Sequence, residues 1–213
     1  MIARFASIVL VLASVGTSYA QTLPAPSLSE AESRALELAH SHEMRGRDAE
    51  AFEAYRIFLS FDRDAVDVHL HFAGMARARL GLARSRALFL ELSQNLRNPG
   101  VKLATATLVD RSERRRSLEA FVDAHPDYGP AHMLVAEEFR QWALENQPVR
   151  DRLRERELLS RFLELDAQGK LGPSFIDSTL LAGWLDRAER RLAELDIGLN
   201  NSIAAPPPRW SIG

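Results

Sequence analysis

The sequence contains no cysteine, and lysine occurs only at Lys102 and Lys170. Without cysteine the chain can form no disulfide and has no residue for a lipoprotein anchor, so its stability must come from side-chain packing. The other 25 of the 27 Lys and Arg residues are arginine, a bias that is typical of a GC-rich bacterial genome. The composition therefore indicates a bacterial source and says nothing about mechanism.

The N-terminus lacks a hydrophobic run long enough to cross a bilayer. Its apolar stretch covers residues 5–15, follows Arg4 and precedes the small-residue end Ser18-Tyr19-Ala20, which is the pattern of a secretory signal peptide. A membrane span needs roughly 20 apolar residues, so a permanent anchor is disfavoured. We expect cleavage after Ala20, with the mature chain periplasmic or secreted and without a stable membrane anchor.

A surplus of positive charge is also missing, since 27 Lys and Arg residues stand against 29 Asp and Glu residues. Loss of Arg4 with the signal peptide leaves 26 basic residues and a net charge of −3. Neutralising a phosphate backbone requires an excess of Lys and Arg. We therefore expect no nucleic-acid partner.

Signatures of catalysis are scarce. No Gly-x-Ser-x-Gly elbow occurs, and no cysteine can serve as a nucleophile. The segment Gly169-Lys170-Leu171-Gly172 is too short for a phosphate-binding loop and precedes Pro173, so it indicates a turn. Acidic pairs such as Glu137-Glu138 are typical of solvated helix faces. We expect no enzymatic activity and no cofactor.

Two His-x-His pairs are the candidates for a metal site, since imidazole is a common ligand of zinc and copper. They are His40-Ser41-His42 and His69-Leu70-His71. Residues two apart on a helix point in different directions, so neither pair can chelate a metal alone. His40 could still meet a histidine of the neighbouring helix. The prediction is that no metal binds.

Apolar residues recur with helical spacing along most of the chain, which is 46% hydrophobic. Helices are expected near residues 29–46, 48–61, 64–80, 82–96, 111–124, 130–145, 149–165 and 174–195. Ser29 and Glu32 form a capping box for the first helix, and Asp64 caps the third. Residues 98–100 are expected to end the fourth. Residues 101–109 fit both a strand and a helical stripe, and we favour a short helix, which gives an all-α fold of about nine helices.

Prolines mark both ends of this helical region. Pro24 and Pro26 indicate an extended lead over residues 21–28, and the helical domain spans residues 29–196. Residues 197–213 lack helical periodicity and contain the run Pro206-Pro207-Pro208. We expect this tail to be disordered or to adopt polyproline II structure.

A helical hairpin with its turn at Gly46 carries the clearest internal pattern. Its other characteristic positions are Leu38-Ala39 in the first helix and Ala51, Tyr55 and Phe58 in the second. Residues 35–62 resemble a tetratricopeptide repeat, in which small residues stand where two helices cross and large ones fill between them. A shift of about 34 residues, the length of such a repeat, gives a weaker copy. A third copy begins after His125-Pro126, and Arg63 stands where the closing proline of the first is expected.

The resemblance implies a superhelix of stacked hairpins whose first helices line a concave groove for a protein or peptide segment. The groove positions carried over from the family are His40, Glu43, Met44, Asp67, Leu70, Arg77, Met133, Glu137, Arg140 and Gln141. Because only the first copy is regular, we expect the interaction to centre near the first two hairpins. The function implied is a scaffold or adaptor in the cell envelope.

Two other classes of function stay open. One is an envelope enzyme or metal-binding factor with a histidine site between repeats, and the other is a structural subunit that assembles through exposed hairpin ends. The densest positive cluster consists of Arg111, Arg114, Arg115 and Arg116. Guanidinium groups match carboxylate and phosphate geometry, so the cluster could receive an anionic partner. Acidic neighbours favour a solvated helix face instead.

Overall fold

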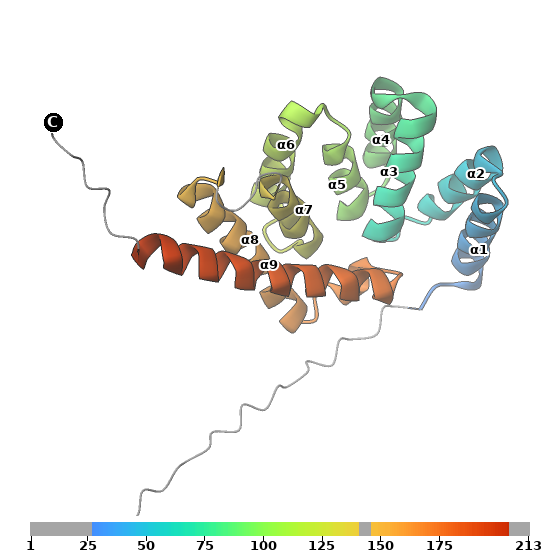
Figure 1. Ribbon diagram of the computed structural model, residues 1–213. Coiled ribbons are helices and arrows are strands. Elements are labelled where there is room, and N and C mark those ends of the chain that lie inside the picture. Colours follow the sequence, from blue (N-terminus) through green and yellow to red (C-terminus); the bar gives the residue numbers. More distant parts are fainter. Residues whose placement is uncertain (1–26, 141–145, 205–213) are drawn as a thin grey trace, which may run out of the picture.

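Helices make up the regular structure of the computed structural model, which describes residues 27–140 and 146–204 (Figure 1). These two stretches contain nine α-helices and no strand. The helices are α1 (Glu30–Met44), α2 (Asp48–Leu59), α3 (Val66–Leu80), α4 (Leu82–Asn95), α5 (Pro99–Thr107), α6 (Arg111–Ala124), α7 (Gly129–Phe139), α8 (Val149–Ala167) and α9 (Ser178–Ala204), with the short 3-10 helix η2 (Gly172–Ser174) before α9. The predicted all-α fold is confirmed.

Consecutive helices pair as hairpins, α1 with α2, α3 with α4, α5 with α6 and α7 with α8. Each hairpin packs against the next, and α3 contacts α5 directly. Helix α9 has no partner of this kind; it packs on α8 and runs beneath α7, α5 and α3 (Figure 1). Helices α5 and α6 form a separate hairpin, which lies between the second and third predicted copies of the repeat.

The segment with ambiguous periodicity is helical. Helix α5 begins at Pro99, where the missing N–H removes no helical hydrogen bond. The side chain of Asn98 accepts a hydrogen bond of 2.9 Å from the backbone N–H of Val101 and caps the helix. Residues 98–100 were expected only to end the preceding helix. They start the next one, because α4 already stops at Asn95.

The capping box at the start of α1 is confirmed. The Ser29 backbone N–H donates to Glu32 Oε2 at 2.7 Å, and the Glu32 N–H donates to Ser29 Oγ at 3.2 Å. The cap predicted for α3 is wrong, since its N-cap is Ala65 and receives no side-chain hydrogen bond. The carboxylate of Asp64 binds donors from later parts of the chain instead.

The C-terminal boundary of the helical region lies beyond the predicted residue 196. Helix α9 continues to Ala204, so the predicted tail is wrong for residues 197–204. Arg152 of α8 donates to the carbonyl of Gly198 at 3.2 Å, and Arg156 pairs with Asp196, so α8 supports these last turns. Residues 1–26 and 205–213 lie outside the described residues, and with them the predicted signal peptide, most of the predicted extended lead and the proline run.

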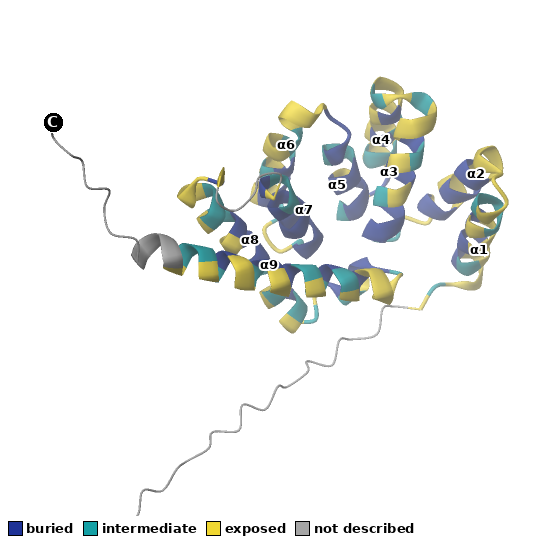
Figure 2. Cartoon of the chain, in the orientation of Figure 1, coloured by how far each residue is buried: buried dark blue, intermediate teal, exposed yellow. Residues whose placement is uncertain are grey.

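Two apolar clusters form the core, and both draw on α3 and α5 (Figure 2). In the N-terminal cluster the ring of Phe72 packs between those of Phe52 and Phe89, with centroid-to-centroid distances of 4.7 and 5.7 Å. Leu70 packs against both clusters and joins them. In the two described stretches, no helix combines the length and apolarity that a membrane crossing requires.

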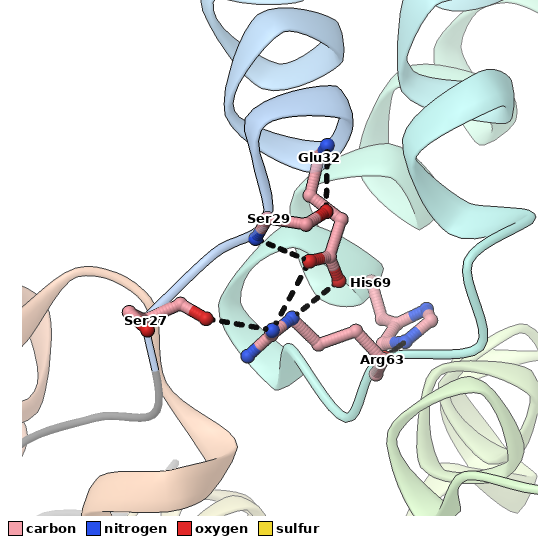
Figure 3. A network of polar contacts seen from close by, with 5 residues as sticks. All are labelled: Ser27, Ser29, Glu32, Arg63 and His69. Carbon is pink, nitrogen blue, oxygen red and sulfur yellow. Dashed lines mark hydrogen bonds and ion pairs between the residues drawn. The ribbon is translucent and has the colours of Figure 1, made fainter.

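Arg63, in place of the closing proline, joins α1 to α3 through polar contacts (Figure 3). Its Nε and Nη2 donate to the two carboxylate oxygens of Glu32 at 2.6 and 3.1 Å. Its backbone carbonyl lies 3.1 Å from Nε2 of the fully buried His69. The guanidinium lowers the pKa of Glu32 to about 2, and burial lowers the pKa of His69 to about 4.

Candidate partner-binding groove

The chain itself covers most of the concave face that was expected to bind a partner. Residues 168–177, which we name the crossing strap, lead from α8 to α9 and contact the start of α3. The hydroxyl of Ser174 donates to Asp64 Oδ2 at 2.6 Å. The backbone N–H groups of Ile176 and Asp177 donate to Asp67 Oδ2 at 3.0 and 2.7 Å. Helix α9 then passes below α3, α5 and α7 in the view of Figure 1 and packs on α8.

The carboxylate of Asp64 connects its own segment with three others. Its Oδ2 accepts from the Ser174 hydroxyl, and its Oδ1 accepts from the Gly100 N–H at 3.1 Å and from the Tyr128 hydroxyl at 2.7 Å. Burial raises the pKa of Asp64 despite these donors, and burial also raises the pKa of Tyr128 well above its usual 10. The tyrosine therefore stays a hydrogen-bond donor at neutral pH. From the sequence, Asp64 was expected only to cap a helix. Its three donors lie 36, 64 and 110 residues away, and no local pattern points to them.

Three of the predicted groove residues are largely enclosed by the chain itself. Asp67 is 8% exposed and has both oxygens engaged, one by the strap and one by the Val68 N–H. Leu70 is half-buried between the two clusters. Met133 is 2% exposed in the C-terminal cluster, so its assignment to an open groove is wrong.

The remaining predicted residues of the later copy lie against α9. The carboxylate of Glu137 lies 3.6 Å from a guanidinium nitrogen of Arg187, and burial raises its pKa. Arg140 is the exposed C-cap of α7 and lines a small hollow together with Arg187 and Arg191 of α9. Gln141 lies outside the described residues. The later half of the predicted surface thus serves contacts within the chain.

Around the buried ring of Tyr55, a cluster of polar side chains from the first hairpin and from α3 reaches the surface. Glu43 accepts from the Tyr55 hydroxyl at 2.8 Å and lies 2.9 Å from Nε2 of His71. The Tyr55 ring meets His40 on one side, with centroids 5.9 Å apart, and His71 on the other, at 5.2 Å. Burial and the Glu43 carboxylate raise the pKa of Tyr55, so its hydroxyl remains a donor. These contacts bring α1, α2 and α3 together at one point.

A pocket of about 190 Å³ opens between this cluster and the start of α9, and we name it the groove pocket. It is lined by Leu36, His40, Tyr55, Asp67, Val68, His71, Ile176, Asp177 and Leu180. The lining combines apolar side chains with the three ring-bearing residues His40, Tyr55 and His71 and the two aspartates Asp67 and Asp177. Leu180 is 37% exposed at one edge. The pocket can receive a single side chain with an apolar stem and a polar head.

The groove pocket only partly coincides with the predicted surface. His40 and Asp67 line it, and Glu43 lies next to it, whereas Met44, 87% exposed, and Arg77 do not line it. His71 stands four residues after Asp67 on the same helical face, and that spacing could have identified it. The contributions of the strap and α9 carried no local signal.

His40 and His71 each contact the ring of Tyr55, with centroids 5.9 and 5.2 Å from it, and both histidines are exposed. Among the described residues, no group of three or more His, Asp or Glu side chains has the arrangement of a metal site.

The arginine cluster on α6 is largely engaged in contacts within the protein. Arg114 pairs with Glu138 of α7 at 3.0 Å, and the Arg115 guanidinium lies 4.9 Å from the centroid of the Phe139 ring. A wider hollow of about 670 Å³ lies between α6 and α8, and its arginines are also paired. Because arginines of both features are in contacts within the chain, the groove pocket is the stronger candidate for a binding site.

Comparison with known proteins gives little beyond the fold. No protein-family model matches the chain, and no curated protein matches it. It is similar to the solved structure of MamA 41-end from Desulfovibrio magneticus RS-1, with 13% sequence identity and a TM-score of 0.33. The match covers 84% of this chain and 100% of that chain. At this identity and TM-score, the similarity carries no argument about what this chain does.

Proposed function

We propose that the protein is an exported, non-catalytic helical scaffold that binds a protein or peptide partner at the groove pocket. The observation that carries the proposal is the preformed pocket between α1, α3 and the start of α9, with exposed and half-buried side chains around a rigid floor. Stacked helical hairpins present such surfaces to extended segments. The pocket supplies an anchor point, and the surrounding polar groups supply specificity.

The state of the polar groups favours binding over catalysis. Glu43 is held by Tyr55 and His71, and Asp67 is held by three backbone N–H groups. Side chains held in this way form a preformed surface, which lowers the entropy cost of binding a partner. Such an arrangement is suited to recognition by a surface that does not change on binding.

The proposal is tested by comparing two substitutions of exposed leucines. Leu180→Arg places a long, positively charged side chain at the edge of the groove pocket, whereas Leu90→Arg does so on α4, where Leu90 is 46% exposed. Proteins captured by the wild-type chain from its native cells should be lost with Leu180→Arg, with a weakening of at least about tenfold. They should be retained with Leu90→Arg. Equal capture by both variants would place the binding site elsewhere.

Export is supported by the charged start, short apolar run and small-residue end of residues 1–20. N-terminal sequencing of the mature protein should find a start near Gln21. A mature chain that begins at Met1 would contradict export by a cleaved signal.

A further inference from the structure

We propose that the groove pocket receives one basic side chain, arginine or lysine, from the partner. This inference rests on the proposed function and specifies the chemistry of the same pocket. Three observations carry it: the sign of the charge in its lining, the apolar surface beside that charge and its size.

The charge of the lining is negative. Asp67 and Asp177 stand in the wall, and none of the nine lining residues is Lys or Arg. Glu43 adds a third carboxylate next to the pocket, through its contacts with Tyr55 and His71. A cation that enters is attracted by all three carboxylates, and it meets no arginine or lysine in the wall.

Asp177 has capacity left for a ligand. Its Oδ1 accepts from the backbone N–H groups of Thr179 and Leu180 at 2.8 and 3.2 Å, which caps α9. Its side chain is exposed, and among the described residues no donor binds its Oδ2. A carboxylate offers about four acceptor positions, so the second oxygen can bind a guanidinium or ammonium group.

The apolar part of the lining supplies a second attraction for the same ligand. The methylene stem of Lys or Arg packs against apolar surface while its charged head stays near polar groups. Leu36, Val68 and Ile176 provide that surface. The Tyr55 ring is 1% exposed and is held in place by its contacts with His40 and His71.

The size excludes bulkier ligands. A volume of about 190 Å³ lies below the roughly 300–1,000 Å³ of typical small-molecule sites. It is also too small for a helix. One long side chain, presented by a peptide that lies outside the pocket, fits these dimensions.

The experiment uses two capped peptides, acetyl-Leu-Arg-Leu-amide and the same peptide with citrulline, which keeps the shape of arginine and lacks its charge. They are titrated into the mature protein while the imidazole resonances of His40 and His71 are followed by NMR. We expect saturable shifts with the arginine peptide, binding at least about tenfold weaker with citrulline, and weaker binding as salt rises from about 20 to 200 mM. Absence of saturable shifts up to about 10 mM arginine peptide would overturn the inference, as would equal binding of the citrulline peptide.

Two matched variants locate the charge. Asp177→Asn keeps the helix cap, because Asn caps as well as Asp, and it removes one negative charge from the wall. Asp186→Asn removes an exposed charge from the same helix, away from the pocket. Arginine-peptide binding should fall at least about fivefold with Asp177→Asn and stay unchanged with Asp186→Asn. If Asp177→Asn binds the arginine peptide like wild type, the assignment of the charge is wrong.

The two proposals fail in different ways. If Leu180→Arg abolishes capture of the natural partner while Asp177→Asn leaves it intact, the pocket binds a partner but not through a basic side chain. If Leu180→Arg leaves capture intact, the proposed function itself fails, whatever the peptides show.

Discussion

The hydroxyl of Ser174 donates a hydrogen bond of 2.6 Å to the carboxylate of Asp64, 110 residues earlier in the chain. Together with the two bonds from the strap to Asp67, this contact holds the start of α9 against the start of α3. The C-terminal helix is thereby part of the pocket built on the first hairpin. Loss of these contacts would disturb both the stability of the fold and the shape of the pocket.

Ser174→Ala should destabilise the protein by about 1–3 kcal/mol, because it leaves a buried carboxylate oxygen without its donor. The free energy of unfolding from urea titration measures the effect. Ser93→Ala is the control, since the exposed Ser93 hydroxyl bonds only to the nearby Leu90 carbonyl. The control should change stability by less than about 0.5 kcal/mol. Equal effects of the two substitutions would show that the contact with Asp64 adds nothing.

Two helical glycines should respond to alanine with opposite signs. A Cβ at Gly100 would lie 2.7 Å from Asp64 Oδ1 and 2.7 Å from His69 Cδ2, so Gly100→Ala forces these buried groups apart. We expect a loss of about 1–3 kcal/mol. A Cβ at Gly74 meets no atom within 4 Å, and Gly74→Ala should stabilise α3 by about 1 kcal/mol. Thermal unfolding of both variants checks the prediction, and a gain in stability with Gly100→Ala would contradict it.

The contact between Arg63 and Glu32 should matter far more than an exposed pair. Arg63→Leu leaves the largely buried Glu32 without its guanidinium and should cost about 2–4 kcal/mol in unfolding free energy. The control, Arg34→Leu, breaks a pair whose side chains are 76% and 87% exposed, and should cost less than about 0.5 kcal/mol.

The same pair should set part of the acid stability. The pKa of Glu32 is lowered from 4.5 to about 2, so its stabilisation is fully present above pH 4.5 and is lost as the pH falls to about 2. In Arg63→Leu the unfolding free energy should fall less steeply through this window than in wild type. Identical slopes would mean that Arg63 is not the cause of the shift.

His69 should add a second acid-sensitive contribution at higher pH. Burial lowers its pKa from 6.5 to about 4, so between these values the native state binds fewer protons than the unfolded state. Stability therefore falls as the pH drops from 6.5 to about 4, by up to roughly 3 kcal/mol, and this contribution then levels off. An NMR titration of the His69 imidazole should give a midpoint near 4. A midpoint near 6.5 would contradict the burial argument.

The sequence predicted what depends on neighbours along the chain. Helical spacing and the box of Ser29 and Glu32 fixed the first hairpin, and Tyr55 took the central position that its repeat pattern implied. The strap could not be predicted, because Asp64 and Asp67 bind donors more than 100 residues away and no local pattern encodes such pairs. The buried position of Met133 follows from the same cause, since its helix looked amphipathic until α9 covered it.

The most direct test of the central claim is photo-crosslinking from the groove pocket in the cells that make the protein. A photoreactive benzoyl-phenylalanine at His40, which lines the pocket, is compared with the same group at the exposed Arg86 of α4. We expect a defined protein adduct from position 40 that is absent from position 86 and is lost when Leu180→Arg is added. No adduct at position 40, or the same adducts at both positions, would contradict a scaffold that binds its partner at this pocket.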